Sequence, residues 1–172
     1  MFKLIGAIIL LAASGYTGWS IARRYARRPV ELRQFITALQ MLETEIIYAA
    51  TPLPDALAGI AERVETGVAS FFNYAAQELK TARGTSAREA WRAALGTYQT
   101  FSSLDRGDLG ILNSLGQNLG ISDRDDQVKH LRLTLEQLKM AQFQAEETAA
   151  KNVKLWNYAG FLGGLIIVLA LY

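Results

Sequence analysis

The sequence contains no cysteine, only one histidine and only three prolines. Without cysteine, disulfides, thiolate zinc sites, iron–sulfur clusters and a cysteine nucleophile are excluded. His130 has Asp126 four residues earlier, on the same face if the segment is helical, but no further ligand accompanies the pair. Phosphate-binding GxxxxGK[ST], GxGxxG, HExxH and GxSxG motifs are also missing. We expect a protein that is not an enzyme, with no catalytic, cofactor-binding or metal site; an enzyme centred on Asp126 and His130 is the alternative.

Charged residues are missing from two long segments, Leu4–Ala22 and Leu155–Tyr172. A helix rises about 1.5 Å per residue, so each segment comes close to the thickness of the hydrocarbon core of a bilayer. Both ends of the second segment carry aromatic residues of the kind found at membrane interfaces. The sequence predicts transmembrane helices at residues 1–22 and 155–172, with a water-soluble domain at 23–154 between them. A signal peptide cleaved near Leu11–Ser14 is the alternative for the first segment.

Four arginines follow the first apolar segment within six residues: Arg23, Arg24, Arg27 and Arg28. Basic clusters next to a span tend to stay in the cytoplasm, and the two lysines before the second segment agree. We therefore expect a hairpin with a cytoplasmic central domain and both termini outside. A nucleic-acid patch is the other interpretation, but the position favours orientation and contact with anionic lipid headgroups of the bilayer. The formal net charge of +2 likewise gives no reason to expect nucleic acid as a partner.

The central domain shows apolar residues at three- and four-residue steps and no alternating β pattern, which predicts an all-α, compact helical bundle of about six helices. Pro29 is expected to open the first helix of the domain, Thr51–Pro54 to end it, and Gly84 and Gly120 to stop two later helices. Ser86 and Glu89 have the spacing of a capping box, and Ser122 with Asp125 resembles another cap. The expected helices cover residues 29–50, 55–64, 68–83, 86–98, 108–119 and 123–172, the last running unbroken into the second apolar segment.

Several short motifs occur in an order that resembles the stage III sporulation protein AB family of endospore-forming bacteria. They are Leu32–Gln34, Ala38–Ile46, Thr51–Leu53, Ala56–Leu57, Glu89–Trp91, Leu119–Arg124 and Gln127–Leu131. That family is similar in turn to the cytoplasmic domains of type II secretion and type IV pilus inner-membrane platform proteins. Their Gly-x-Pro-Leu-x-x-Ala-Leu style of motif would correspond here to Thr51–Leu57, with Thr51 in place of the glycine.

The resemblance implies a non-catalytic, secretion-like platform in the channel complex that links mother cell and forespore. It would lie in the outer forespore membrane and face a secretion-type cytoplasmic ATPase, stage III sporulation protein AA, on the mother-cell side. Other membrane components of the complex are the further partners implied, and a homo-oligomer is an option. Two segments of the central domain are candidates for the partner surface, and their residues are Thr51, Pro52, Leu53 and Asp55, and Asp123, Arg124, Asp126 and Lys129. A membrane-anchored adaptor or receptor, whose helical domain binds a signalling partner, is the alternative function.

Overall fold

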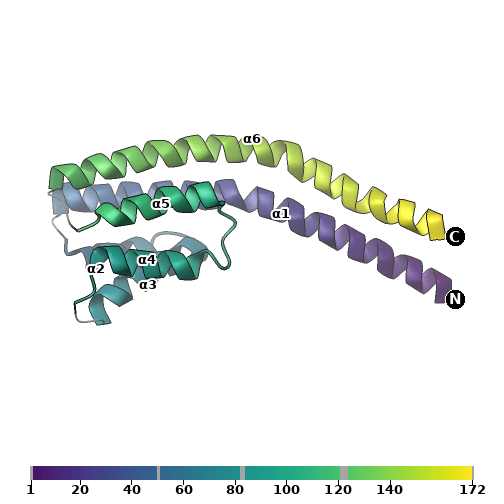
Figure 1. Ribbon diagram of the computed structural model, residues 1–172, viewed down its shortest axis with the longest axis horizontal. Helices are drawn as coiled ribbons and strands as arrows, with labels where there is room; N and C mark the ends of the chain where they lie inside the picture. Colours follow the sequence, from purple (N-terminus) through teal and green to yellow (C-terminus); the bar gives the residue numbers. More distant parts are fainter. Residues whose placement is uncertain (1, 50, 82–83, 121–123, 172) are drawn as a thin grey trace. The chain divides into compact units, whose positions relative to one another are not determined.

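The computed structural model of the chain describes residues 2–49, 51–81, 84–120 and 124–171. These residues form helices and no strand, which confirms the all-helical prediction (Figure 1). The elements in chain order are α1 (Phe2–Thr44), the π-helix η1 (Glu45–Ala49), α2 (Leu53–Ala61), α3 (Thr66–Thr81), α4 (Ala87–Tyr98), α5 (Arg106–Asn118) and α6 (Arg124–Leu171).

The chain divides into two compact units. One consists of Met1–Pro29 with Phe143–Tyr172, and the other of Val30–Gln142. Because α1 and α6 are each continuous helices, both of them contribute residues to both units. The predicted division into 1–22, 23–154 and 155–172 refers to a bilayer and stays a prediction.

Pro29 does not open a helix, and this prediction was wrong. α1 passes through Pro29, which is buried inside it, so the first apolar segment and the first bundle helix are one element. A proline inside a helix loses one hydrogen bond and costs about 3 kcal/mol. Starting a new helix here would leave several N–H groups without partners, since neither Arg27 nor Arg28 offers a side-chain acceptor as a cap. One lost bond is the smaller cost.

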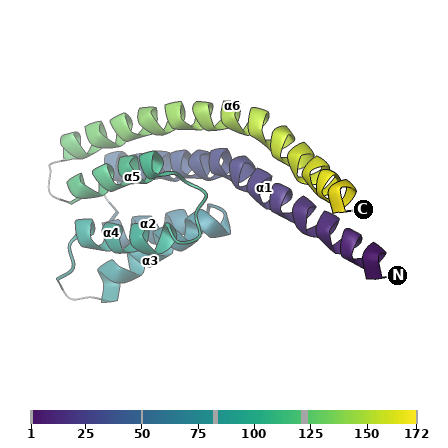
Figure 2. The same cartoon turned by 45° about the vertical axis from the view of Figure 1, so that its right-hand side comes forward.

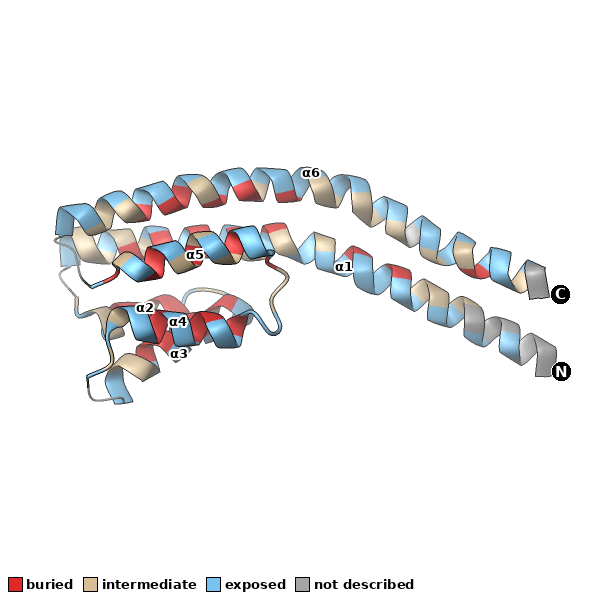
Figure 3. Cartoon of the chain, viewed as in Figure 1, coloured by how far each residue is buried: buried red, intermediate tan, exposed pale blue. Residues whose placement is uncertain are grey.

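The core of the Val30–Gln142 unit is built around five aromatic side chains. α2, α3 and α4 lie together on one side of the bundle part of α1, and their buried faces turn toward it (Figures 2 and 3). Phe35 of α1 meets Phe71 and Phe72 of α3 and Tyr98 of α4, with ring centroids 5.3–6.0 Å apart. Trp91 stands edge-on to Phe71 at 4.7 Å. All of these pairs except the tilted Phe35–Phe72 pair are edge-to-face, and such pairs add about 0.5–1.5 kcal/mol each to the burial of apolar area.

Capping boxes open both α4 and α5. The box predicted at Ser86 is confirmed: its Oγ accepts a hydrogen bond from the N–H of Glu89, whose carboxylate accepts one from the N–H of Ser86. These bonds from Ser86 lower the pKa of Glu89. The second box was not predicted from the sequence; in it the Asp105 carboxylate accepts a 2.9 Å hydrogen bond from the N–H of Asp108. α5 therefore begins at Arg106 and not at residue 108.

Two glycines after helices have positive φ, as their predicted role as helix stops requires. Gly84 has φ +92° and follows α3, and Gly120 has φ +78° and follows α5. Non-glycine residues rarely adopt this conformation. The predicted Ser122 cap of the last helix lies outside the described residues. α6 continues unbroken to Leu171, as predicted.

A half-buried carboxylate ties the loop after α4 to α1. Glu31 accepts hydrogen bonds from the Tyr98 hydroxyl at 2.8 Å, the Ser102 hydroxyl at 2.6 Å and the Ser103 N–H at 3.0 Å. Burial and the charge of Glu31 raise the pKa of the Tyr98 phenol above its ordinary value. The phenol therefore stays protonated and works as a donor in the fold.

In the unit that contains the chain ends, α1 and α6 run antiparallel and approach closely at small residues (Figure 1). The Ser14 hydroxyl donates a 2.5 Å hydrogen bond to the carbonyl of Gly160. A Cβ added at Gly18 would lie 2.6 Å from the carbonyl oxygen of Trp156, and one added at Gly160 would lie 3.0 Å from the Cα of Gly18. Small residues of this kind allow close helix packing in lipid.

Candidate functional site: a pocket at the end of the bundle

The candidate site is built where α1 ends in a π-helix, Glu45–Ala49. π-helical turns are rare and occur often at functional sites, because the wider turn changes where side chains point. Here the Glu45 carboxylate accepts a 2.7 Å hydrogen bond from the Thr51 hydroxyl beyond the turn. Pro52 then opens α2: its φ of −54° is pre-set, and its carbonyl accepts bonds from the N–H groups of Asp55 and Ala56.

A pocket of about 290 Å³ lies beside this turn. Its apolar wall comes from α1, η1 and α2, and its polar groups are a carboxylate, a hydroxyl, a guanidinium and an amide. The lining residues are Leu42, Glu45, Ile46, Thr51, Leu53, Ala56, Gly120, Arg124 and Gln127. An apolar wall with a few fixed polar groups is typical of surfaces that bind a partner side chain or segment.

The pocket brings together the two sequence segments that were predicted as a partner surface. Thr51 and Leu53 from the start of α2 and Arg124 from the start of α6 all line it. Pro52, the N-cap of α2, is exposed between Thr51 and Leu53. Segments about seventy residues apart in the chain thus meet at one end of the bundle.

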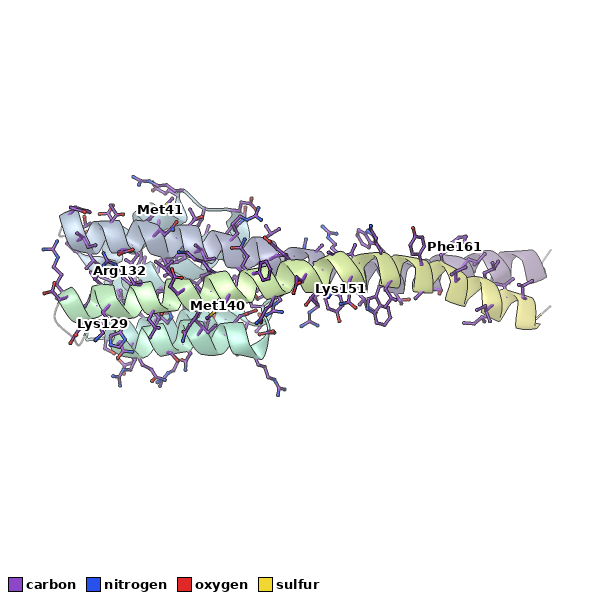
Figure 4. All side chains as sticks on the ribbon, turned by 90° about the horizontal axis from the view of Figure 1, so that it is seen from above. Met41, Lys129, Arg132, Met140, Lys151 and Phe161 are labelled. Atoms are coloured by element: carbon purple, nitrogen blue, oxygen red, sulfur yellow. The ribbon has the colours of Figure 1, made fainter. Side chains whose placement is uncertain are left out.

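The remaining candidates lie outside the pocket lining. Asp55 is exposed and forms a 2.7 Å ion pair with Lys80 of α3. Asp126 and Lys129 are exposed on α6, where Figure 4 shows Lys129 near Arg132. Asp123 lies outside the described residues.

Several residues of the site were not predicted from the sequence. Glu45 accepts a hydrogen bond from Thr51, and Ile46 and Gln127 line the pocket. Tyr48, two residues after Ile46 in η1, is 81% exposed. Tyrosine is, with tryptophan and arginine, one of the residue types enriched in the hot spots of protein interfaces. The one signal in the sequence that could have pointed to Tyr48 is its position three residues before Thr51, where the proline turn begins.

His130 is half-buried on α6, one turn after Asp126. The described residues include no group of three or more histidines and carboxylates that could hold a metal ion. The polar groups that the pocket gathers are suited to hydrogen bonding and ion pairing with a partner.

Of the four orientation arginines, Arg23 packs its guanidinium over the Trp19 ring, 5.0 Å from the ring centre. A guanidinium at this distance from the face of a tryptophan ring is attracted to it electrostatically. Arg24 and Arg27 are exposed, and Arg28 is half-buried. Their role in orientation stays a prediction.

Among the described residues, one helix contains a stretch that is long and apolar enough to cross a bilayer, and it is α6. This criterion concerns length and composition, so the two predicted spans, at residues 1–22 and 155–172, stay predictions.

These observations define a class: an all-helical bundle with a pocket where its first long helix ends and its last begins, and a second unit in which the same two helices pack through small residues. The family model for stage III sporulation protein AB matches residues 3–172. Stage III sporulation protein AB of Bacillus subtilis (strain 168) is 37% identical over 171 residues, which are 99% of each chain. A solved structure of stage III sporulation protein AB matches with a TM-score of 0.69 at 35% identity, over 72% of this chain and 97% of the solved one. The chain belongs to the stage III sporulation protein AB family, and this membership links it to sporulation.

Proposed function

We propose that the chain is a non-catalytic membrane platform of the mother cell–forespore channel complex. It receives the conformational work of a secretion-type cytoplasmic ATPase on its helical bundle and passes this work to partners in the outer forespore membrane. The central bundle faces the mother-cell cytoplasm, and the two apolar segments lie in the bilayer.

The observation that carries this proposal is the continuity of α6. One helix runs from Arg124, which lines the bundle-end pocket, to Leu171 in the apolar segment. Because no loop interrupts α6, a displacement of its bundle part would be passed along the helix to the apolar segment. The ATPase would bind the pocket and the neighbouring Tyr48, because this is where the start of α2 and the start of α6 meet.

The contact with the ATPase is tested by reversing one charge in the pocket. Arg124→Glu should abolish co-purification of the full-length protein with the ATPase from membranes of sporulating cells. Arg63→Glu is the matched control, because Arg63 is an exposed arginine outside the pocket. Equal ATPase recovery with both variants would refute binding at the pocket.

The coupling is tested by interrupting α6. A flexible Gly-Ser segment inserted after Ala149 should abolish formation of heat-resistant spores and leave ATPase binding intact. The same segment inserted after Glu65, in the turn before α3, serves as the control because loops tolerate insertions. Full sporulation with the Ala149 insertion would show that α6 does not pass movement of the bundle to the membrane.

Replacing both apolar segments by unrelated spans separates the platform from a membrane-anchored adaptor. A platform makes specific contacts in the bilayer through residues such as Gly18 and Gly160, so it should fail. An adaptor needs only an anchor, and normal sporulation with foreign spans would favour it over the platform.

A further inference from the structure

A second pocket lies between α4 and α5, away from the bundle-end pocket. Its volume is about 370 Å³, and every residue that lines it comes from α4, its C-cap or α5. The lining residues are Arg92, Leu95, Gly96, Gln99, Arg106, Leu109, Gly110 and Asn113. None of these is acidic, and none lines the pocket at the bundle end.

The eight lining residues are two copies of one pattern. α4 and its cap present Arg92, Leu95-Gly96 and Gln99, and α5 presents Arg106, Leu109-Gly110 and Asn113. Each copy reads Arg-x-x-Leu-Gly-x-x-amide. An arginine and an amide seven residues apart lie two helical turns apart, or roughly 10 Å, on the same face.

α4 and α5 are antiparallel, so the two copies of the pattern run in opposite directions along the groove (Figure 1). Two contacts fix the register: Arg88 donates to the carbonyl of Gln117, and Trp91 Nε1 donates to that of Leu112 at 2.8 Å. This register places Arg92 opposite Asn113 and Gln99 opposite Arg106. Each end of the groove therefore has one guanidinium and one amide.

The middle of the groove is open. A Cβ added at Gly96 or Gly110 would meet nothing within 4 Å, and Leu95 beneath them is almost fully buried. Glycines at the centre of a groove let another backbone approach closely.

The arginines at the ends carry no ion pair within the part of the chain that the structure describes. Neither Arg92 nor Arg106 pairs with a carboxylate there. Glu89, one turn before Arg92, is hydrogen-bonded to the N–H and hydroxyl of Ser86 and forms no ion pair with Arg92, although the charge of Arg92 adds a small share to the lowering of the Glu89 pKa. The groove thus has an arginine at each end and no acidic residue in its lining. Charge complementarity therefore favours a partner that carries negative charges.

We propose that the α4–α5 groove binds an acidic helical segment of another protein, with two carboxylates seven residues apart on one face and small apolar residues between them. Each carboxylate lies at one end of the groove and accepts bonds from an arginine and the neighbouring amide. The small residues pack over Gly96 and Gly110. This proposal is independent of the ATPase contact, because the two pockets share no residue.

The test uses the full-length protein in detergent and three fluorescein-labelled helical peptides, read by fluorescence anisotropy. The first peptide has two glutamates seven residues apart on an alanine and leucine background, the second has glutamines in their place, and the third has the two glutamates on opposite faces. We expect the first to bind at least about tenfold more tightly than the other two, because both charged ends must be satisfied together.

Variants assign the binding to the groove. Arg92→Gln and Arg106→Gln should each weaken binding of the first peptide by about tenfold, and Arg63→Gln, which removes a charge elsewhere, should not. Gly96→Leu places a side chain in the groove and should block binding, and Gly96→Ala, whose Cβ meets nothing within 4 Å, is the smaller variant that should keep the fold. Circular dichroism checks that each variant is folded.

Three results would overturn the proposal. The first is equal affinity for the two-glutamate and two-glutamine peptides. The second is an equal loss with Arg63→Gln, which would mean unspecific attraction. The third is binding of inorganic phosphate that depends on Arg92 and Arg106 while no peptide binds, which would make the groove a site for a small anion.

Discussion

At Gly116 of α5 there is no room for a side chain, because Trp91 lies directly against its backbone. A Cβ at this position would lie 2.2 Å from Cδ1 and 2.8 Å from Cγ of Trp91. Trp91 cannot move away, because it is fully buried and its Nε1 is bound to the carbonyl of Leu112. The absence of a side chain at Gly116 is thus a packing requirement of the aromatic core.

Replacing Gly116 with alanine should destabilise the fold by about 1–3 kcal/mol, since the added methyl overpacks the core. Urea unfolding of the purified protein, followed by tryptophan fluorescence, measures this change. Gly110→Ala is the control in the same helix: its Cβ meets nothing, so the better helix propensity of alanine should stabilise by about 0.5–1 kcal/mol. Similar effects of both substitutions would contradict the packing argument.

Tyr98 makes stability depend on pH in the alkaline range. Its phenol has a pKa of about 10 in the unfolded chain, and burial and Glu31 raise this pKa in the fold. The unfolded state therefore loses the proton first. The stabilisation is complete below pH 10 and decreases as the pH rises above it.

The wild-type protein should lose about 1 kcal/mol more stability than Tyr98→Phe between pH 9 and pH 11. Lysines also titrate in this range, so the difference between the two proteins isolates the phenol. Urea unfolding at the two pH values gives this difference. Parallel pH profiles for the two proteins would show that the phenol titrates alike in both states.

At the scale of elements, the end of a helix can be predicted from the sequence where the residues that cap it are close neighbours in the chain. Ser86-x-x-Glu89 was recognisable because a capping box needs only four neighbouring residues. Asp105-x-x-Asp108 forms the same reciprocal bonds, but an aspartate in the fourth position falls outside the usual pattern. The prediction for Pro29 was wrong for a related reason. Proline favours the first turn of a helix, but no residue beside Pro29 can cap a new helix there, so α1 continues through it.

The candidate site was predictable in part for the same reason. Thr51 and Leu53 stand at a proline turn that the sequence shows directly, and Arg124 stands at a helix start. Their meeting in one pocket depends on how α1, α2 and α6 pack, which no local pattern encodes. The π-helix that places Glu45 also has no sequence signature of its own.

Asp105→Ala should destabilise the protein by about 1 kcal/mol and fray the start of α5, because the N–H of Asp108 loses its cap. Asp105→Asn keeps an acceptor oxygen and should cost much less. Urea unfolding gives the free energies, and hydrogen exchange of the amides near Arg106 reports the fraying. Equal costs for alanine and asparagine would assign the effect to charge and not to capping.

At the scale of the whole molecule, the unit at the chain ends depends on the contact of two helix backbones. The atoms nearest a Cβ at Gly160 are the Cα of Gly18 and the carbonyl oxygen of Ser14, each 3.0 Å away. Backbone atoms cannot rotate out of the way as a side chain can. At Gly163, one turn further along α6, the nearest atom is the Ser14 hydroxyl oxygen at 4.0 Å.

Gly160→Ile should force α1 and α6 apart in this unit, whereas Gly163→Ile adds the same apolar bulk at a tolerant position. In a sporulating host that lacks its own protein of this family, Gly160→Ile should lower the level of the protein several-fold and the yield of heat-resistant spores with it. Gly163→Ile should keep both near the wild-type value. Because the two variants match in hydrophobicity, any difference between them comes from helix contact, and equal spore yields would show that this contact is dispensable for the function.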